Sequence, residues 1–495
     1  MSIKPQYETY RYTDEICKLK SQSIVECRLP GSEIGTVLAI QAKVAPTETT
    51  CADGEVHYGG KLLLCILYED LDRKICRAER GAEFFHKAEG NLVTPACFAK
   101  ALLHAENITY RREGSGLYVS AIVGATLNVY GVKQTEYLFG GDGLIVKNEP
   151  MEIVRTVCIS GETEGEDEFE TDYVGDILMH GENAVVTQAT AVDGQIDIEG
   201  ELILNVCALK DGDGVCSYER VIPFRMQIPC EEAFSKIRVG ARVSVKSAQL
   251  TAGVDEDAGK SKIVFSYCLL ADCFLHCIDG ISATQDAFST QSEIGLTLKN
   301  GQGRYLTNMQ KSAERIIGSA AINAPTDGTY ALACALLPEA EAHVRKTENG
   351  VDVEGAITAE VLLKSEDGGY KACTLTLPFV FPVYVSGDEL EIDCAVCGLN
   401  VRRKPSGETE AEATLKICLR SYEHRAWRYV GEVEEGEAIE VPTAAISVFM
   451  PRAGEDLWSV AKRLKRAPED VVESNPELTF PVRDGERIFV YRQIK

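Results

Sequence analysis

Three segments of this 495-residue chain repeat one pattern, and the repeat restricts the possible folds more than any other feature. The segments begin DGEVHYGG at Asp53, DGQIDIEG at Asp193 and NGVDVEG at Asn349. Each opens with an Asx-Gly turn, which is followed by a long run of alternating apolar residues. Alternate side chains of a strand point to opposite faces, so the alternation predicts a strand with one buried face.

Two further positions place the three copies in register. Each copy has a glycine inside the predicted strand and a phenylalanine 24 residues later. The pairs are Gly60 and Phe84, Gly200 and Phe224, and Gly355 and Phe379. A glycine inside a strand indicates a bulge or the close approach of another backbone. The glycines are 140 and 155 residues apart (200 − 60 and 355 − 200), so the repeating unit is a whole domain rather than one turn of a solenoid.

The repeat predicts a mainly β chain with three tandem β-rich domains. A chain of this length is too long for one core, and its 45% of hydrophobic residues is too high for general disorder. The predicted domains are residues 1–147, 148–302 and 303–436. Residues 437–445 are the predicted linker to a small α+β domain at residues 446–495.

The small C-terminal domain is predicted from the segment RAGEDLWSVAKRLKRAPEDVVESNP, residues 452–476. Apolar residues recur in it at the spacing of one helix face, at Leu457, Val460, Ala461 and Leu464. Pro468 suits the first position of a second helix. ISVFM before this segment and GERIFVYR after it are typical of short strands. The predicted order is strand, helix, helix, strand.

Charge is distributed unevenly along the chain, whose formal net charge is −25. Residues 446–495 hold 9 Lys+Arg and 8 Asp+Glu, whereas the preceding residues hold 42 and 68 (51 − 9 and 76 − 8). This balance disfavours nucleic acid and anionic membranes as main partners, because phosphates would be repelled. A basic cluster at residues 462–466 is either a solvated helix face or a docking face.

Export and membrane insertion are not expected. No apolar run approaches the roughly 18 residues of a membrane-spanning helix. The N-terminal MSIKPQYETYRYTDEICKLK is polar and lacks the apolar core of a secretory signal. We therefore expect the chain to remain in the compartment in which it is made.

The sequence predicts no catalytic residues, no cofactor and no metal site. The eighteen cysteines lie mostly in strand-like runs, where a thiol acts as a small apolar side chain. Cys394 and Cys397 form a lone CxxC pair, and Cys273, His276 and Cys277 lie in a strand-like stretch, so reduced core thiols are favoured over a structural metal. Motifs of the GxxxxGK[ST], HExxH and GxSxG types are absent, so we expect a protein that is not an enzyme.

The C-terminal segment resembles a LysM domain. The resemblance is carried by Gly454, Leu457, Trp458, Val460, Ala461, Asn475, Pro476, Gly485, Ile488 and Val490. In that family two loops beside the helices form a shallow groove for N-acetylglucosamine polymers. Carried over by position, the groove would comprise Arg452, Gly454, Glu455, Asp456, Leu457, Asn475, Pro476, Leu478, Thr479 and Phe480. The family commonly has threonine where this chain has Asp456.

The whole arrangement resembles the SipL-type SPOCS-LysM family of spore-forming Firmicutes. The resemblance implies three SPOCS domains, synthesis in the mother-cell cytoplasm, and recruitment to the forespore surface and spore coat. It also implies docking to a SpoIVA-like protein of the coat basement layer, so we expect a non-enzymatic scaffold or adaptor. The alternative is a peptidoglycan-binding protein of the spore cortex or cell wall.

The expected docking face lies on the first helix of the C-terminal domain. It comprises Trp458, Lys462, Arg463, Lys465 and Arg466. Its charges would orient a partner and raise the association rate, and the aromatic ring would supply desolvated contact. For Trp458, both packing within the domain and contact with a ligand remain open.

Overall fold

Antiparallel strands form almost all of the chain, and the predicted mainly β class is confirmed. The computed structural model describes residues 3–30, 34–114, 116–172, 174–210, 214–255, 259–323, 330–348, 350–404, 408–440 and 446–491. Asn349 and residues 441–445 of the predicted linker lie outside the described residues.

The first unit contains six strands in two sheets. Its strands are β1 (Lys4–Pro30), β2 (Ile34–Ala52), β3 (Glu55–Asp70), β4 (Ile75–Glu89), β5 (Phe98–Glu113) and β6 (Gly116–Asp142). One sheet has the order β1-β6-β5, and the other has the order β2-β3-β4. The first and last strands of the unit, β1 and β6, therefore pair with each other. Strands β2, β3 and β4 form a meander in the second sheet.

The second unit repeats this topology. Its strands are β7 (Ile145–Asp172), β8 (Val174–Val192), β9 (Gln195–Lys210), β10 (Gly214–Pro229), β11 (Arg238–Asp255) and β12 (Lys260–Phe288). The sheet orders are β11-β12-β7 and β10-β9-β8. They are the orders of the first unit, strand for strand.

The third unit has the same two sheets with one short additional strand. Its strands are β13 (Ser292–Ser319), β14 (Ala321–Ile322), β15 (Tyr330–Thr347), β16 (Gly350–Ser365), β17 (Tyr370–Val383), β18 (Glu389–Arg403) and β19 (Thr409–Ala438). The sheet orders are β13-β19-β18 and β14-β17-β16-β15.

The turns between units lie elsewhere than the sequence predicts. The predicted boundaries at residues 147 and 302 fall inside strands β7 and β13. The chain passes from one unit to the next at residues 143–144 and 289–291, and the third unit ends with Ala438. The repeat motifs lie in the middle strands of each unit, so they do not report where the long first and last strands begin and end.

The glycine and phenylalanine of each repeat are cross-strand partners in all three units. They pair between β3 and β4, between β9 and β10, and between β16 and β17. A Cβ atom added to any of the three glycines would lie less than 3.0 Å from the partner's phenyl ring, as at Gly60 and Phe84. The glycine therefore leaves room for the ring to lie across the strand. The predicted equivalence of the three glycines is confirmed.

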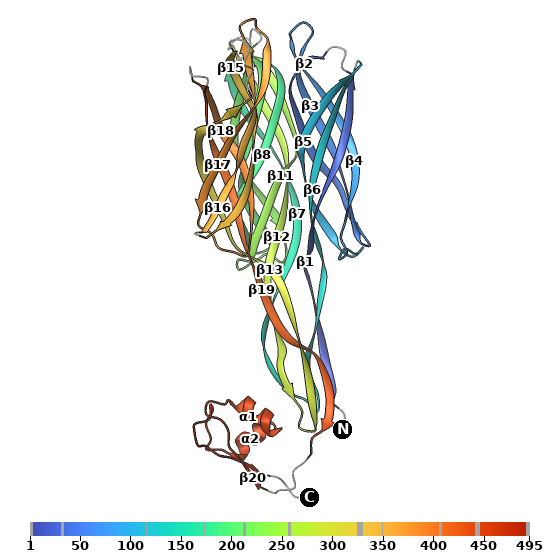
Figure 1. The fold of residues 1–495 in the computed structure, drawn as a ribbon, viewed down its shortest axis with the longest axis vertical. Helices are drawn as coiled ribbons and strands as arrows, with labels where there is room; N and C mark the ends of the chain where they lie inside the picture. The colour runs from blue at the N-terminus through green and yellow to red at the C-terminus, as the bar shows by residue number, and fades with distance from the viewer. Residues whose placement is uncertain are drawn as a thin grey trace.

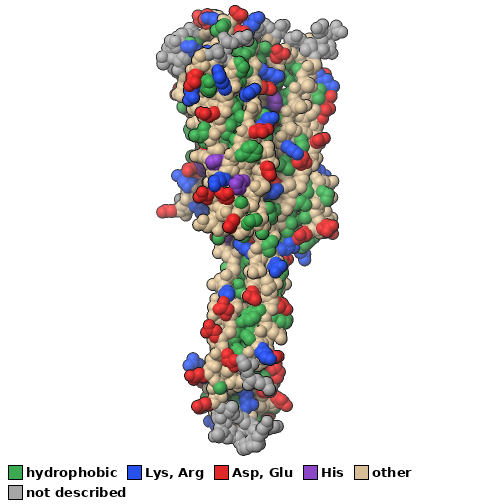
Figure 2. All heavy atoms as spheres, turned by 90° about the vertical axis from the view of Figure 1, so that its right-hand side faces the viewer, with side chains coloured by type: hydrophobic (Ala, Val, Ile, Leu, Met, Phe, Trp, Pro, Cys, Tyr) green, Lys and Arg blue, Asp and Glu red, His purple; other side chains and the backbone are tan. Residues whose placement is uncertain are grey.

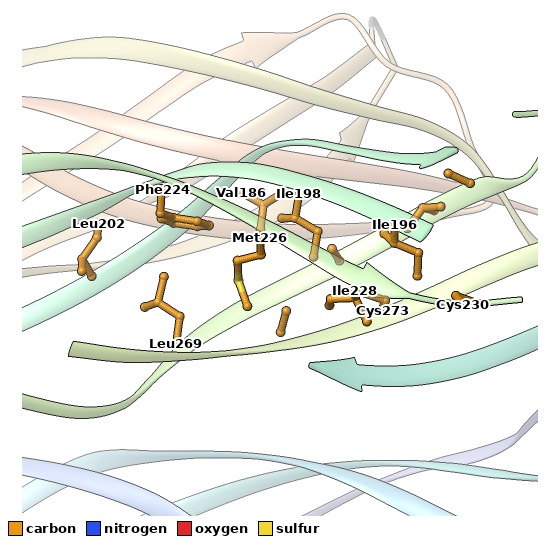
Figure 3. Close-up of a cluster of buried hydrophobic side chains, with 14 of the residues drawn as sticks. Val186, Ile196, Ile198, Leu202, Phe224, Met226, Ile228, Cys230, Leu269 and Cys273 are labelled. Atoms are coloured by element: carbon orange, nitrogen blue, oxygen red, sulfur yellow. The ribbon is translucent and has the colours of Figure 1, made fainter. Parts of the chain in front are cut away.

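The core of the second unit shows how the alternating pattern is used. Ile196, Ile198 and Leu202 point from β9 into the space between the two sheets, together with Phe224 and Met226 of β10 (Figure 3). Side chains of β12 close the cluster from the other sheet, among them Leu269 and Cys273. All eighteen cysteines of the chain are free thiols, and many of them are buried in this way.

The three units lie side by side and share a stem (Figure 1). The paired ends of β1 with β6, β7 with β12 and β13 with β19 extend beyond the rest of the units as three two-stranded ribbons. Aromatic and aliphatic side chains fill the space between the ribbons, including Tyr12, Ile153 and Trp427. On the face in Figure 2, acidic and basic side chains are interspersed along the surface of the narrow stem.

A separate C-terminal module follows the third unit. Its elements are β20 (Ile446–Phe449), α1 (Leu457–Leu464), α2 (Pro468–Ser474) and β21 (Ile488–Tyr491). This is the predicted order of strand, helix, helix, strand. The module lies near the free end of the stem, where the N-terminus also lies (Figure 1). Among the described residues, no helix is long and apolar enough to cross a membrane.

Candidate functional site in the C-terminal module

The entrance of α1 is fixed by Asp456. Its carboxylate accepts a hydrogen bond of 2.9 Å from the Ser459 backbone N–H, which caps the helix. Hydrogen bonds from the side chain and from the backbone of Ser459 hold the pKa of Asp456 below its usual value. The side chain predicted to lie in a sugar groove is therefore a helix cap, a role that aspartate fills as well as threonine does.

The loop before α1 is tied to the strand side of the module. The Gly454 N–H donates to the Val482 carbonyl at 2.8 Å, and the Val482 N–H donates to the Glu455 carbonyl at 2.9 Å. The Glu455 carboxylate also accepts hydrogen bonds from the Arg452 N–H and from the Arg463 guanidinium. The predicted first side of the groove is thus a braced turn, and Arg452 and Gly454 are exposed on it.

The predicted second side of the groove is partly internal. Asn475 is buried, and its amide donates to the carbonyls of Val471 and Phe489 at 2.9 Å, while its oxygen accepts from the Phe489 N–H at 2.7 Å. Asn475 therefore joins α2 to β21. Leu478 and Phe480 pack against the module's core, whereas Pro476 and Thr479 are exposed. Leu457 also packs against that core.

The predicted docking face is in large part covered by the chain's own stem. The Trp458 indole N–H donates to Oδ2 of Asp286 at 2.8 Å, and the Lys462 ammonium lies 2.5 Å from Oδ1 of the same carboxylate. Lys465 forms an ion pair of 2.6 Å with Glu293. These acidic residues belong to the stem tip, which we define as residues 286–293 at the end of β12 and the start of β13. Three of the five residues of the predicted docking face therefore contact the stem tip.

The two other basic residues of the predicted face behave differently. Arg463 points to Glu455 and lies over the Phe449 ring, with its guanidinium carbon 4.7 Å from the ring centroid. Arg466 is half-buried at the end of α1, where its N–H donates to the Ala461 carbonyl. Both therefore stabilise the module itself.

Phe288 of the stem tip completes the module's core. It is fully buried together with Val460, Ala461 and other core side chains of the module. Its ring meets the Trp458 ring edge to face, with 5.2 Å between the centroids. No local pattern in the sequence marks Asp286 and Phe288 as partners of a helix about 170 residues away, so sequence reasoning missed them.

The charge on Asp286 is stabilised in this contact. Burial by itself raises the pKa of Asp286, but hydrogen bonds from Lys462 and Trp458, together with the lysine charge, lower it by more. The pKa consequently lies below the usual aspartate value. The carboxylate is ionised at neutral pH, which matches the two donors that hold it.

The outer face of the β20–β21 sheet is apolar and open. Ile446 pairs with Tyr491 and Val448 pairs with Phe489 across the two strands. These side chains and that of Met450 are each 42–62% exposed. Ile488 and Val490, on the opposite face, are buried in the module. The sheet face is defined here as the five exposed residues Ile446, Val448, Met450, Phe489 and Tyr491. A contiguous exposed apolar patch on a small domain is typical of an interaction site.

Charged groups also meet where the stem joins the three units. Glu391 contacts Arg242 at 2.8 Å, Arg304 and Lys18 at 2.9 Å, and Arg420 at 3.5 Å. Burial by itself raises the pKa of Glu391, but the four cations outweigh this effect and hold the pKa well below its usual value. The cluster joins residues of all three units, so we interpret it as a structural device.

His276 is part of the same junction. Its Nδ1 lies 3.0 Å from the Arg304 carbonyl. Burial is the main cause that lowers the pKa of His276 to about 4, and the nearby Arg304 charge is the second cause. The imidazole is therefore neutral at neutral pH. It is buried and lines a cavity of only about 10 Å³.

An open cavity of about 400 Å³ lies where β2, β8 and β15 meet. Small apolar side chains form much of its lining, and its carboxylates are those of Glu339 and Glu360. Glu360 accepts a hydrogen bond from Thr374, and burial raises the pKa of Glu360. Polar side chains are interspersed in the lining, and the Thr374–Glu360 hydrogen bond joins cross-strand neighbours of β16 and β17.

Within the part of the chain that the structure describes, no three or more His, Cys, Asp or Glu side chains are grouped to hold a metal ion. No protein-family model, curated protein or solved structure matches this chain.

Proposed function

We propose that this chain is a non-enzymatic scaffold of the spore coat, of the SipL-like SPOCS-LysM type. In this proposal the C-terminal module is a LysM domain that docks to a SpoIVA-like protein of the coat basement layer. The chain would be made in the mother-cell cytoplasm and recruited to the forespore surface. The three repeated units would be SPOCS domains, which present the module at the end of the stem.

The observation that carries this proposal is the sheet face. The polar face of α1 is engaged by the stem tip, so the apolar side of the β20–β21 sheet is a surface that the module leaves open. It offers aromatic rings at Phe489 and Tyr491 beside aliphatic side chains. Clusters of this composition are typical of the central part of protein–protein interfaces.

Peptidoglycan binding is the second candidate, and the exposed loop residues favour it. Arg452, Gly454, Pro476 and Thr479 are exposed on the two loops beside the helices. Their polar groups could hydrogen-bond sugar hydroxyls. Asp456 has less capacity to do so, because one of its carboxylate oxygens already caps α1.

One pair of binding measurements separates the two candidates. Purified full-length chain is tested against immobilised SpoIVA-like protein and against insoluble peptidoglycan. We expect the sheet-face variant Val448→Asp/Phe489→Asp to lose at least about tenfold in affinity for the protein, because it places charges in the centre of the interface. The loop variant Arg452→Ala/Thr479→Ala should keep that affinity.

A matched control is available on the body of the molecule. Val380 on β17 is 63% exposed, compared with 53% for Val448, so Val380→Asp adds one of the two charges of the sheet-face variant at an exposed valine far from the module. We expect it to bind like the wild type. Saturable binding to peptidoglycan that is lost in the loop variant, with no binding to the coat protein, would overturn the proposal in favour of the second candidate.

A further inference from the structure

The contact between α1 and the stem tip has the form of a peptide-recognition site. We infer that this face of the module binds short segments of the form Asp-x-Phe, and that the chain's own residues 286–288 occupy it here. A partner segment of the same chemistry would exchange with the stem tip. The identity of that partner as a coat protein rests on the proposed function, whereas the recognition chemistry does not.

The acidic position is recognised by two donors on one helix face. Trp458 and Lys462 are four residues apart, so their side chains project from the same side of α1. The indole N–H binds one oxygen of the Asp286 carboxylate at 2.8 Å, and the ammonium lies 2.5 Å from the other. A carboxylate that engages separate donors with both oxygens is held in orientation as well as in position.

The aromatic position is recognised by burial. Phe288 is 0% exposed, and the side chains around it belong mainly to the module, including Val460, Val471 and Ile488. Its ring meets Trp458 at an interplanar angle of 65°, a geometry that aromatic pairs favour. An aromatic anchor in a desolvated pocket is the usual centre of a peptide interface.

The third contact is weaker and more exposed. The Glu293 side chain that pairs with Lys465 is 60% exposed, and exposed ion pairs contribute little to affinity because water and salt screen them. Asp286 and Phe288 therefore define the recognised segment, while Glu293 adds long-range attraction.

Occupation by the chain's own stem tip lowers the apparent affinity for an external segment. The internal segment competes at the effective concentration that its covalent connection sets. An external peptide binds only the fraction of molecules in which the site is free, so its apparent dissociation constant rises in inverse proportion to that fraction. Removing the internal ligand should therefore reveal the site.

The test uses a fluorescent peptide with the sequence SATQDAFSTQSE, which is residues 282–293 of this chain. Its binding to the full chain is followed by fluorescence anisotropy. We expect Asp286→Ala/Phe288→Ala to bind the peptide about tenfold or more tighter than the wild type does. The milder Asp286→Asn should give a smaller gain in the same direction, and it keeps the test valid if loss of Phe288 impairs folding.

Two controls establish specificity in the opened chain. Adding Trp458→Ala should abolish peptide binding, whereas Glu469→Gln, at an exposed position of α2, should change it little. Peptides in which the aspartate or the phenylalanine is replaced by alanine should not bind.

Absence of peptide binding to the folded Asp286→Asn and Asp286→Ala/Phe288→Ala chains would overturn the inference. Equal binding with and without Trp458 would also overturn it. Neither result affects the sheet face, whose binding to the coat protein is measured separately, so failure of this inference and failure of the proposed function remain distinguishable.

Discussion

At the scale of single residues, the glycine beneath each repeat phenylalanine leaves no room for a side chain. In the second unit, a Cβ on Gly200 would collide with the Phe224 ring and the Val185 carbonyl. We expect Gly200→Val to destabilise its unit by about 1–3 kcal/mol, the range for strained or overpacked substitutions. The midpoint of urea unfolding, followed by circular dichroism, measures the loss.

Gly253 provides the matched control for this prediction. It lies on β11 of the same unit, and a Cβ there would meet only one atom, at 3.9 Å. Gly253→Val should change the unfolding midpoint little. Equal losses for both variants would contradict the assignment of Gly200 to a tight contact.

Glu391 is the second residue whose environment leads to a quantitative expectation. Glu391→Gln would remove the charge that compensates three partly or fully buried arginines. Breaking a buried ion pair by removing one partner costs about 3–5 kcal/mol. The free energy of unfolding in guanidinium chloride should fall by an amount of this order.

An exposed ion pair gives the comparison. Glu412→Gln removes the partner of Arg315, and both side chains are largely exposed. This change should cost less than about 1 kcal/mol. If the two substitutions had the same effect, the junction cluster would not contribute as a buried network.

At the scale of elements, the sequence predicts what local spacing determines. The apolar stripe of α1 places Val460 and Ala461 in the core, and Pro468 begins α2, as the structure confirms. The spacing does not reveal what covers the polar face of the same helix. That contact comes from Asp286 and Phe288, which no periodicity links to α1.

The same limit applies to the predicted groove. Loop residues with similar local sequence patterns have different roles, because the partners of their side chains come from other elements. Asn475 forms hydrogen bonds that join α2 to β21, and Glu455 stabilises the turn before α1. Arg452 and Thr479 remain exposed. Only the three-dimensional contacts separate these roles.

The contact between α1 and the stem tip should depend on pH. The pKa of Asp286 is lowered in the contact, so the contact is favoured by the ionised carboxylate. Its contribution is fully present above the usual aspartate pKa of about 3.9 and is lost as the pH falls through the lower value in the contact. The emission of Trp458 in a Trp427→Phe chain should report this loss.

Asp286→Asn separates this effect from general acid unfolding. The variant retains the shape of the side chain but cannot titrate, so its Trp458 emission should not change in the window just below pH 4. If wild type and variant gave the same acid transition, Asp286 would not be the titrating group.

At the scale of the whole molecule, the three units share the same strand orders, and they are not arranged as separate domains along a string. The first and last strands of each unit continue into the common stem, and the charged cluster around Glu391 joins all three units. Strand ends in the stem carry mixed polar and aromatic residues without the repeat motifs. For that reason the repeat does not reveal the stem, and residues 147 and 302 lie inside β7 and β13.

The central claim is that the C-terminal module docks to a protein at the forespore surface through its sheet face. The most direct measurement is the localisation of full-length fluorescent fusions in sporulating cells, at matched expression. We predict that the wild type and Val380→Asp collect at the forespore surface, whereas Val448→Asp/Phe489→Asp stays dispersed in the mother-cell cytoplasm. Recruitment of the sheet-face variant to the same extent as the wild type would contradict the claim.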